Sequence, residues 1–128
     1  MKYARFIYQN KPLQGIVQDS SIQLLEGNIF GDYRLLDQAI PVAEARLLAP
    51  VQPGKVLATA VNYHSHVAQS RAVLKEEEAP KQPELFYKPI SSIIGPDEPI
   101  IWPSGYEGRV DAEGEMVAVI GKRCRNVS

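Results

Sequence analysis

Two glutamates separated by one glycine are the strongest chemical feature of this 128-residue sequence. Glu113-Gly114-Glu115 lies in an apolar run that favours a β-strand, and alternate residues of a strand share one face. The two Cα atoms would then lie about 6–7 Å apart, close enough for the carboxylates to repel unless a cation lay between them. Hard divalent cations prefer such oxygen ligands. The alternative is a solvent-facing polar stripe on an edge strand.

A histidine is the second candidate for chemistry. His66 lies three residues before Gln69, so the two side chains would share one face of a helix, whereas His64 would not. Imidazole titrates near neutral pH and is a common general base. A surface or partly buried structural histidine is the alternative.

A lysine between aromatic residues and a proline is the third candidate. Lys88, in Phe86-Tyr87-Lys88-Pro89, stands where a short strand would end. From there it could direct its ammonium group at an anionic substrate. The alternative is a lysine whose aliphatic stem covers apolar surface while its charge stays in water.

Composition and net charge limit the class of protein that can contain these candidate residues. Hydrophobic residues make up 45% of the chain and charged residues 23%, as in ordinary soluble globular proteins. The net charge of −1 and the scattered Lys and Arg residues exclude a basic nucleic-acid footprint. The single cysteine, Cys124, makes no intramolecular disulfide, which favours a reducing compartment. The first residues contain no long apolar stretch, so we expect a cytoplasmic protein without a membrane segment.

The first part of the chain predicts a small β domain over residues 1–49. A linker rich in proline follows, from Ala49 to Gly54. Alternation is clearest in the first strand, where one face carries Ala4 and Phe6. The expected elements are strands at 2–8, 14–18 and 21–25, a turn at 9–12, and a short helix at 34–39.

The second part, residues 50–128, is also expected to be mostly strands. Few helices are predicted anywhere in the chain, so the fold class is β-rich α+β. The expected elements are a buried strand at 55–61, a helix at 63–74, a polar loop at 75–83, and strands at 85–87, 92–94, 99–102 and 109–121.

Four runs, in this order, resemble signatures of the fumarylacetoacetate hydrolase family. The resemblance spans about residues 47–128, and the first 46 residues resemble the small N-terminal domain of many bacterial members. The runs are Val61-Asn62-Tyr63-x-x-His66, Pro83-x-Leu85-Phe86-Tyr87-Lys88-Pro89, Ser91-Ser92-Ile93-Ile94-Gly95-Pro96, and Arg109-Val110-Asp111-Ala112-Glu113-Gly114-Glu115 with the residues that follow to Ser128.

The resemblance implies a β-roll catalytic domain and a homodimer that uses a divalent metal. Family members hydrolyse C–C bonds of acylpyruvates or fumarylacetoacetate, decarboxylate oxo acids, or isomerise dienoates, which are catabolic reactions. The resemblance therefore implies an enzyme acting on 2-oxo acids or their enols, with no nucleic acid or membrane as partner.

The resemblance also implies a role for each candidate residue. Glu113 and Glu115 would be two of three carboxylate ligands to Mg²⁺, Mn²⁺ or Ca²⁺, and the third, an aspartate, is expected beyond Ser128. His66 would activate a water or move a proton, and Lys88 would stabilise an enolate or oxyanion. The residues implied to contact substrate are Asn62, Tyr63 and Lys88, with residues 70–82 as a lid.

Two departures from the family pattern keep other interpretations open. Many members have an acidic residue where this chain has Gln69, and an amide supplies no charge to strengthen His66 as a base. Family members also usually continue well past the position of Ser128, so we expect a fragment, a truncated product or one piece of a two-chain enzyme. A non-catalytic relative acting in assembly or binding is the alternative function, and an unrelated small β domain is a third.

Overall fold

The computed structural model describes residues 1–60, 63 and 82–127. Two compact units make up the chain. The first unit joins Met1–Leu48 with Pro96–Ser128, and the second is Ala49–Gly95. Each unit is described on its own.

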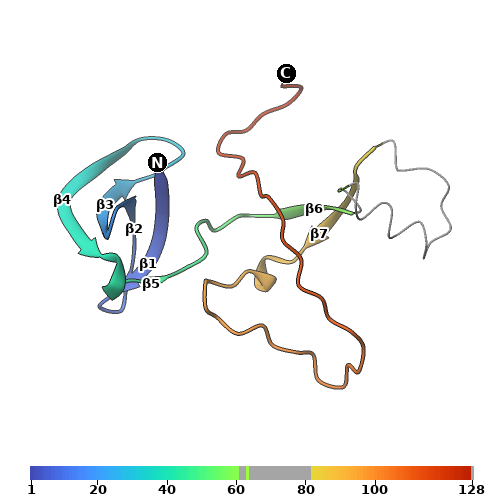
Figure 1. Ribbon diagram of the computed structural model, residues 1–128. Helices are drawn as coiled ribbons and strands as arrows, with labels where there is room; N and C mark the ends of the chain where they lie inside the picture. The colour runs from blue at the N-terminus through green and yellow to red at the C-terminus, as the bar shows by residue number, and fades with distance from the viewer. Residues whose placement is uncertain (61–62, 64–81, 128) are drawn as a thin grey trace. The chain divides into compact units, whose positions relative to one another are not determined.

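The first unit contains a five-stranded antiparallel sheet (Figure 1). Its order, β4-β3-β2-β1-β5, places consecutive strands side by side except for β5, which returns to pair with β1. A short 3-10 helix, η1 (Val42–Glu44), leads into β5. The strands are β1 (Lys2–Tyr8), β2 (Lys11–Gln18), β3 (Ser21–Gly27), β4 (Tyr33–Pro41) and β5 (Arg46–Leu47).

The core of this unit lies on one face of the sheet. Ala4 and Phe6 of β1 are buried, as the predicted alternation requires, and Phe6 has no exposed surface. Ile22 of β3 pairs with Ile40 of β4, and both side chains join the same core. The predicted strands at 2–8, 14–18 and 21–25 are therefore confirmed, and their apolar faces explain why they pack together.

Residues with positive φ form the connections between strands. Gln9 and Asn10 form the two-residue turn between β1 and β2, and both have positive φ, 47° and 61°. Such turns match the right-handed twist of the flanking strands. Gly27 ends β3 with φ 106°, and a Cβ there would lie 2.5 Å from the carbonyl oxygen of Asp32. Only glycine fits that approach.

The helix predicted at residues 34–39 is wrong, because these residues belong to β4. Leu35 pairs with Leu25 of β3, while Ala39 pairs with Gln23, so the register shifts between these two pairs. The shift is a β-bulge, which bends a strand locally. Figure 1 shows β4 as a long, bent strand at the edge of the sheet.

The second unit contains a two-stranded antiparallel sheet. β6 (Val56–Ala60) pairs with β7 (Glu84–Lys88), which confirms strands near 55–61 and 85–87. The burial predicted for the first of them is wrong, because no residue of β6 is buried. The strand predicted at 92–94 is wrong, because a 3-10 helix, η2 (Ile90–Ser92), occupies its start. The hydroxyl of Ser92 donates a hydrogen bond to the carbonyl oxygen of Pro89 at 2.7 Å, which stabilises this turn.

Residues 96–127 form no strand or helix, so the strands predicted at 99–102 and 109–121 are wrong. A strand needs a neighbour to accept and donate its backbone hydrogen bonds, and no described residue pairs with this segment as a ladder. Local contacts shape its start instead. Trp102 donates a hydrogen bond to the carbonyl oxygen of Tyr106 at 3.0 Å, and the two rings are 6.3 Å apart.

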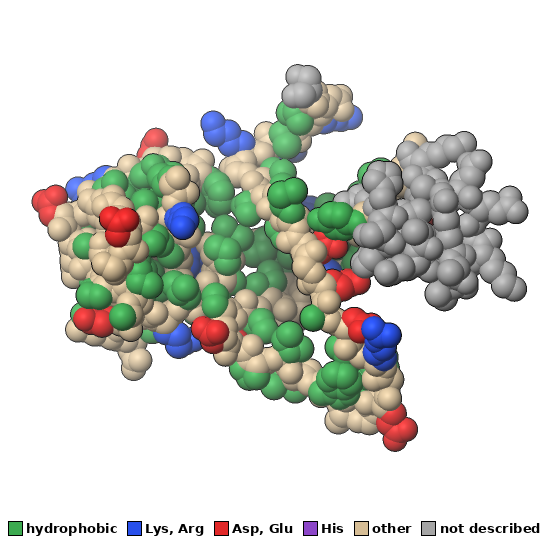
Figure 2. Space-filling model, viewed as in Figure 1, with side chains coloured by type: hydrophobic (Ala, Val, Ile, Leu, Met, Phe, Trp, Pro, Cys, Tyr) green, Lys and Arg blue, Asp and Glu red, His purple; other side chains and the backbone are tan. Residues whose placement is uncertain are grey.

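The described residues form many strands and few helices, which confirms that part of the predicted fold class. The predicted loop at 75–83 and the predicted helix at 63–74, apart from Tyr63, lie outside them or at their edge. Many apolar side chains outside the sheet core are open to solvent, and hydrophobic surface is visible in Figure 2. Among the helices described, none has the length and apolar character needed to cross a membrane.

Candidate functional site

The two predicted metal ligands lie in the segment without regular structure. Glu113 and Glu115 are both exposed, and neither makes an ion pair or hydrogen bond with another described residue. The nearest ion pair along the chain joins Arg109 Nε to Asp111 Oδ1 at 2.7 Å, so this arginine pairs with a different carboxylate. Both glutamates therefore present free oxygen donors.

The donor chemistry of this pair fits a hard divalent cation, because carboxylate oxygens are its preferred ligands. The number of donors is smaller than such an ion needs. Within residues 1–60, 63 and 82–127, no group of three or more His, Cys, Asp or Glu side chains is arranged to hold a metal. Glu113 and Glu115 can thus supply part of a ligand set.

Lys88 is the last residue of β7, where it pairs with Val56 of β6. The side chain is exposed, and its Nζ lies 5.7 Å from the centroid of the Phe86 ring, on the same face two residues earlier. An exposed cation–π contact contributes only about 0.5–1 kcal/mol. The contact therefore favours a position of the ammonium group over the ring, and its positive charge stays available to an anion.

Tyr63 follows β6 and is also exposed. The ladder register places Lys88 opposite Val56, whereas the chain leaves β6 toward Tyr63 at Ala60, four residues away. Four steps along a strand span about 13 Å. The strand pair alone therefore separates Lys88 from the start of the segment that holds the other predicted substrate residues.

The remaining predicted residues, Asn62 and His66, lie outside the described residues, as does Gln69. Lys88 and Tyr63 belong to the unit Ala49–Gly95, whereas Glu113 and Glu115 belong to the other unit. The convergence of these residues on one site therefore remains a prediction.

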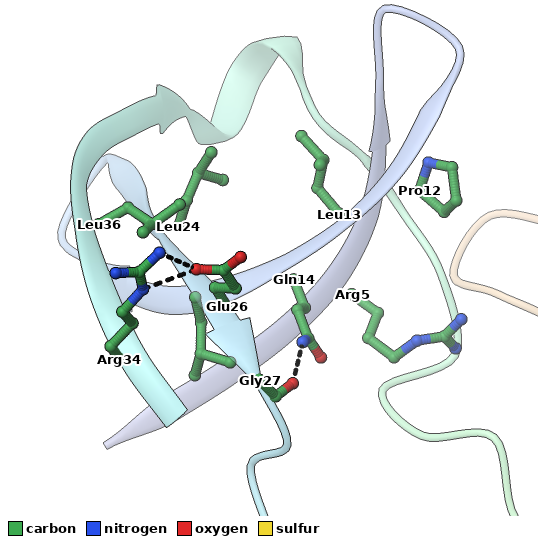
Figure 3. A pocket seen from close by; sticks show the side chains of 10 residues that line it. Arg5, Pro12, Leu13, Gln14, Leu24, Glu26, Gly27, Arg34 and Leu36 are labelled. Atoms are coloured by element: carbon green, nitrogen blue, oxygen red, sulfur yellow. Dashed lines mark hydrogen bonds and ion pairs between the residues drawn. The ribbon is translucent and has the colours of Figure 1, made fainter. Parts of the chain in front are cut away.

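The sheet of the first unit bears an open cavity of about 590 Å³ that was not predicted (Figure 3). Leucines from three strands, Leu13, Leu24 and Leu36, contribute to its wall. Figure 3 shows Arg34 and Glu26 paired across neighbouring strands, and Arg34 Nε donates to Glu26 Oε2 at 2.6 Å.

Three polar side chains that line this cavity, Gln14, Glu26 and Arg34, make hydrogen bonds within the sheet itself. Gln14 accepts a hydrogen bond from the Tyr3 hydroxyl at 2.6 Å and donates one to the carbonyl oxygen of Gly27 at 2.7 Å. Burial raises the pKa of the Tyr3 hydroxyl, and the nearby Arg5 guanidinium acts in the opposite direction. These groups hold β1, β2 and the end of β3 in register, which is a structural role.

Two known families match the sequence, and the boundary between their matches lies in the predicted linker, residues 49–54. Residues 55–128 match the model described as fumarylacetoacetate (FAA) hydrolase C-terminal, and residues 1–50 match the model described as Rv2993c-like, N-terminal. The first match alone covers more than half of the chain, and it contains Lys88, Glu113 and Glu115.

Individual relatives carry several different activities in their names. The caffeoylpyruvate hydrolase of Neonothopanus nambi is 43% identical over 72 residues, which are 53% of this chain and 23% of that protein. The human mitochondrial oxaloacetate tautomerase FAHD2A is 38% identical over 90 residues, 69% of this chain and 26% of that protein.

A solved structure aligns with much of the chain. The 5-carboxymethyl-2-hydroxymuconate delta-isomerase of Mycobacterium smegmatis aligns with a TM-score of 0.63 and 30% identity over 78% of this chain and 37% of that one. The chain spans 41%, 28% and 35% of the length of three further curated relatives. The signature runs, the two domain matches and these relatives together show that the chain belongs to the fumarylacetoacetate hydrolase family.

Proposed function

We propose that this chain supplies part of the active site of a divalent-metal-dependent enzyme that acts on 2-oxo acids or their enols. The observation that carries the proposal is the family match over residues 55–128, which includes the Glu113-Gly114-Glu115 sequence. The proposal covers hydrolysis of a C–C bond next to the oxo group, decarboxylation, and tautomerisation or isomerisation.

The names of the relatives support this substrate class on chemical grounds. Caffeoylpyruvate and oxaloacetate are both 2-oxo acids, and a 2-hydroxymuconate is the enol form of one. All three can pass through an enolate in which negative charge develops on the oxygen at C2. An active site that stabilises that oxygen would serve hydrolysis, tautomerisation and isomerisation alike.

In this proposal Glu113 and Glu115 hold the metal together with a further carboxylate. Their exposure and their lack of described partners leave the oxygens open for that role. When bound, Mg²⁺ or Mn²⁺ would supply Lewis acidity at the oxo and carboxylate oxygens of the substrate.

Lys88 would carry the electrostatic part of the reaction. Its ammonium group is exposed at the end of β7 and held near the Phe86 ring, so it is able to face an anion. A positive charge placed beside the C2 oxygen stabilises the enolate more than the neutral ketone, which lowers the barrier to its formation.

His66 would move the proton in the same reaction. Its imidazole would accept a proton from an attacking water in hydrolysis, or from the carbon next to the oxo group in tautomerisation. Gln69 can orient that ring by a hydrogen bond but adds no negative charge. Asn62 and Tyr63 would bind the substrate beside it, residues 70–82 would close over the site, and the complete enzyme would be a cytoplasmic homodimer with a β-roll fold.

Calorimetric titration of the 128-residue chain with Mn²⁺ tests the central claim. We expect weak binding in the wild type, because the pair is only part of a ligand set, and loss of that binding in the Glu113→Ala/Glu115→Ala variant, which removes both proposed ligands. Glu107→Ala is the matched control, since Glu107 is an exposed glutamate of the same segment outside the pair. The control should bind Mn²⁺ like the wild type.

The outcomes separate the two functions open for the chain. Binding that depends on the glutamate pair supports the enzyme and justifies assays with oxaloacetate and acylpyruvates. Wild-type and double-variant chains that both fail to bind Mn²⁺ would mean that the glutamate pair holds no metal by itself, and would favour the non-catalytic role of this chain in assembly or binding.

A further inference from the structure

A phenylalanine in a loop of the five-stranded sheet of the first unit, called the N-terminal sheet below, contacts a glycine that is close in sequence to the predicted metal ligands. Phe30 lies in the loop between β3 and β4, and Gly121 lies six residues after Glu115. A Cβ added to Gly121 would lie 2.5 Å from Cδ1 of the Phe30 ring and 3.3 Å from Cε1 and Cγ. No real Cβ sits that close to a ring carbon, so the absence of a side chain at position 121 allows the contact.

The loop that carries Phe30 is fixed by its own hydrogen bonds. The backbone N–H of Asn28 donates to the carbonyl oxygen of Asp32 at 2.9 Å. The backbone N–H of Gly31 donates to the carbonyl oxygen of Asn28, also at 2.9 Å. The Phe30 amide also donates to Asn28 Oδ1 at 2.9 Å. A loop closed in this way holds its aromatic side chain in a defined position, as asparagine turns commonly do.

The contact is part of a shared surface. Residues of the β3–β4 loop and of the C-terminal segment line one cavity of about 460 Å³, namely Ile29, Phe30, Gly31, Asp32, Gly121 and Lys122. A second contact ties the other end of the segment to the sheet, because Arg46 Nη1 of β5 lies 3.3 Å from Glu98 Oε1. The two contacts bracket Glu113 and Glu115.

We infer that Phe30 is a positioning residue, which anchors the segment around Glu113 and Glu115 to the N-terminal sheet through Gly121. The segment gains no strand pairing from the described residues, so side-chain anchors of this kind restrict where it can lie. The positioning of metal ligands rests on the proposed function, whereas the anchor itself does not.

Cys124 offers a direct probe of the anchor. It is the single cysteine of the chain and is exposed, three residues beyond Gly121, so a nitroxide label attaches there without other changes. We expect Phe30→Ala to narrow the electron spin resonance lines of the label, since the segment moves faster without the ring. Tyr33→Ala, an aromatic residue of similar exposure that starts β4, is the matched control and should leave the lines unchanged.

A second pair of variants tests the contact from the other side. Gly121→Ala should also mobilise the label, because its methyl group collides with the ring. Adding Phe30→Ala to Gly121→Ala should cause no further mobilisation, since both changes break the same contact. A label whose spectrum is the same in the wild type, in Phe30→Ala and in Gly121→Ala would overturn the anchor.

Mn²⁺ titration then separates the anchor from the proposed function. A several-fold weaker Mn²⁺ affinity in Phe30→Ala, with rescue by Phe30→Tyr, supports positioning of Glu113 and Glu115. An affinity equal to the wild type, despite a mobilised label, would overturn that positioning role. A mobilised label in a chain whose wild type binds no Mn²⁺ supports the anchor and counts against the proposed function alone.

Discussion

Tyr3 shows how one half-buried side chain connects pH to the stability of the N-terminal sheet. Its hydroxyl donates to Gln14 Oε1, and burial raises its pKa above the ordinary value of 10.0, with Arg5 acting against that shift. The folded state therefore keeps the proton at a pH where the unfolded chain has begun to lose it. Such a group stabilises the fold fully below the unfolded pKa and loses that contribution as pH rises through the folded pKa.

We expect the urea midpoint of the wild type to fall between pH 9 and pH 11, to which Tyr3 contributes. Tyr3→Phe should lower the midpoint at pH 8, because the hydrogen bond to Gln14 is lost, but should reduce its dependence on alkaline pH. The exposed Tyr33→Phe serves as control and should keep the wild-type pH dependence. An equal alkaline fall in Tyr3→Phe and wild type would contradict this role.

The candidate site residues were predicted from family signatures because local spacing could not assign them. Glu113 and Glu115 share a face only if their segment is a strand, and its strand partner is a property of distant residues. Phe30 was missed entirely. Its role depends on Gly121, more than ninety positions away, and a glycine in an apolar run signals close approach without naming the neighbour.

At the scale of elements, the turn between β1 and β2 is a point where the sequence is less than optimal. Gln9 and Asn10 both adopt positive φ, and glutamine lacks the tolerance for this region that asparagine and glycine have. The change Gln9→Asn/Asn10→Gly gives the Asn-Gly pair that such turns favour. We expect the free energy of unfolding to rise by about 1 kcal/mol, measured by urea titration.

The opposite change checks that the turn conformation is responsible. Asn10→Ala should lower the free energy of unfolding by about 1 kcal/mol, since alanine adopts positive φ at a cost. If the Asn-Gly variant and Asn10→Ala shifted stability in the same direction, the turn geometry would not explain either effect.

Three of the strands that were predicted correctly have partners nearby in sequence. β1, β2 and β3 follow one another through two-residue turns, so their alternating patterns and their pairing agree. The misassigned helix at 34–39 has a different cause. Leu36 and Ile40 lie four apart, a spacing that places residues on one face of a helix and also on one face of a strand. Pairing with β3 decides between them, and the pattern alone contains no information on that pairing.

At the scale of the whole chain, buried surface is distributed very unevenly. All the buried hydrophobic residues of the described part lie in β1 to β4: Ala4, Phe6, Ile16, Ile22, Leu24, Leu25 and Ile40. In β6 and β7 the large side chains remain exposed, and a two-stranded sheet has little stability by itself. The free energy of folding is therefore concentrated in the first unit.

This distribution predicts that the two units lose structure separately. Phe6 has no exposed surface, and truncation of such a phenylalanine to alanine costs about 3–5 kcal/mol, against a total stability of about 5–15 kcal/mol for a domain. In Phe6→Ala we expect the amides of β1 to β4 to exchange with deuterium far faster than in the wild type. Amides of β6 and β7 should exchange at the wild-type rate, because their unit has its own contacts.

Phe86→Ala is the matched change in the other unit. Phe86 is 44% exposed on β7 and lies beneath the ammonium of Lys88, so its loss should affect exchange in β6 and β7 and leave β1 to β4 protected. If each variant accelerates exchange only in its own unit, the N-terminal sheet can lose stability without disturbing the strand that carries Lys88. Acceleration of β6 and β7 by Phe6→Ala to the same extent as β1 to β4 would instead show one cooperative unit, and the exposed strands would then draw their stability from the N-terminal core.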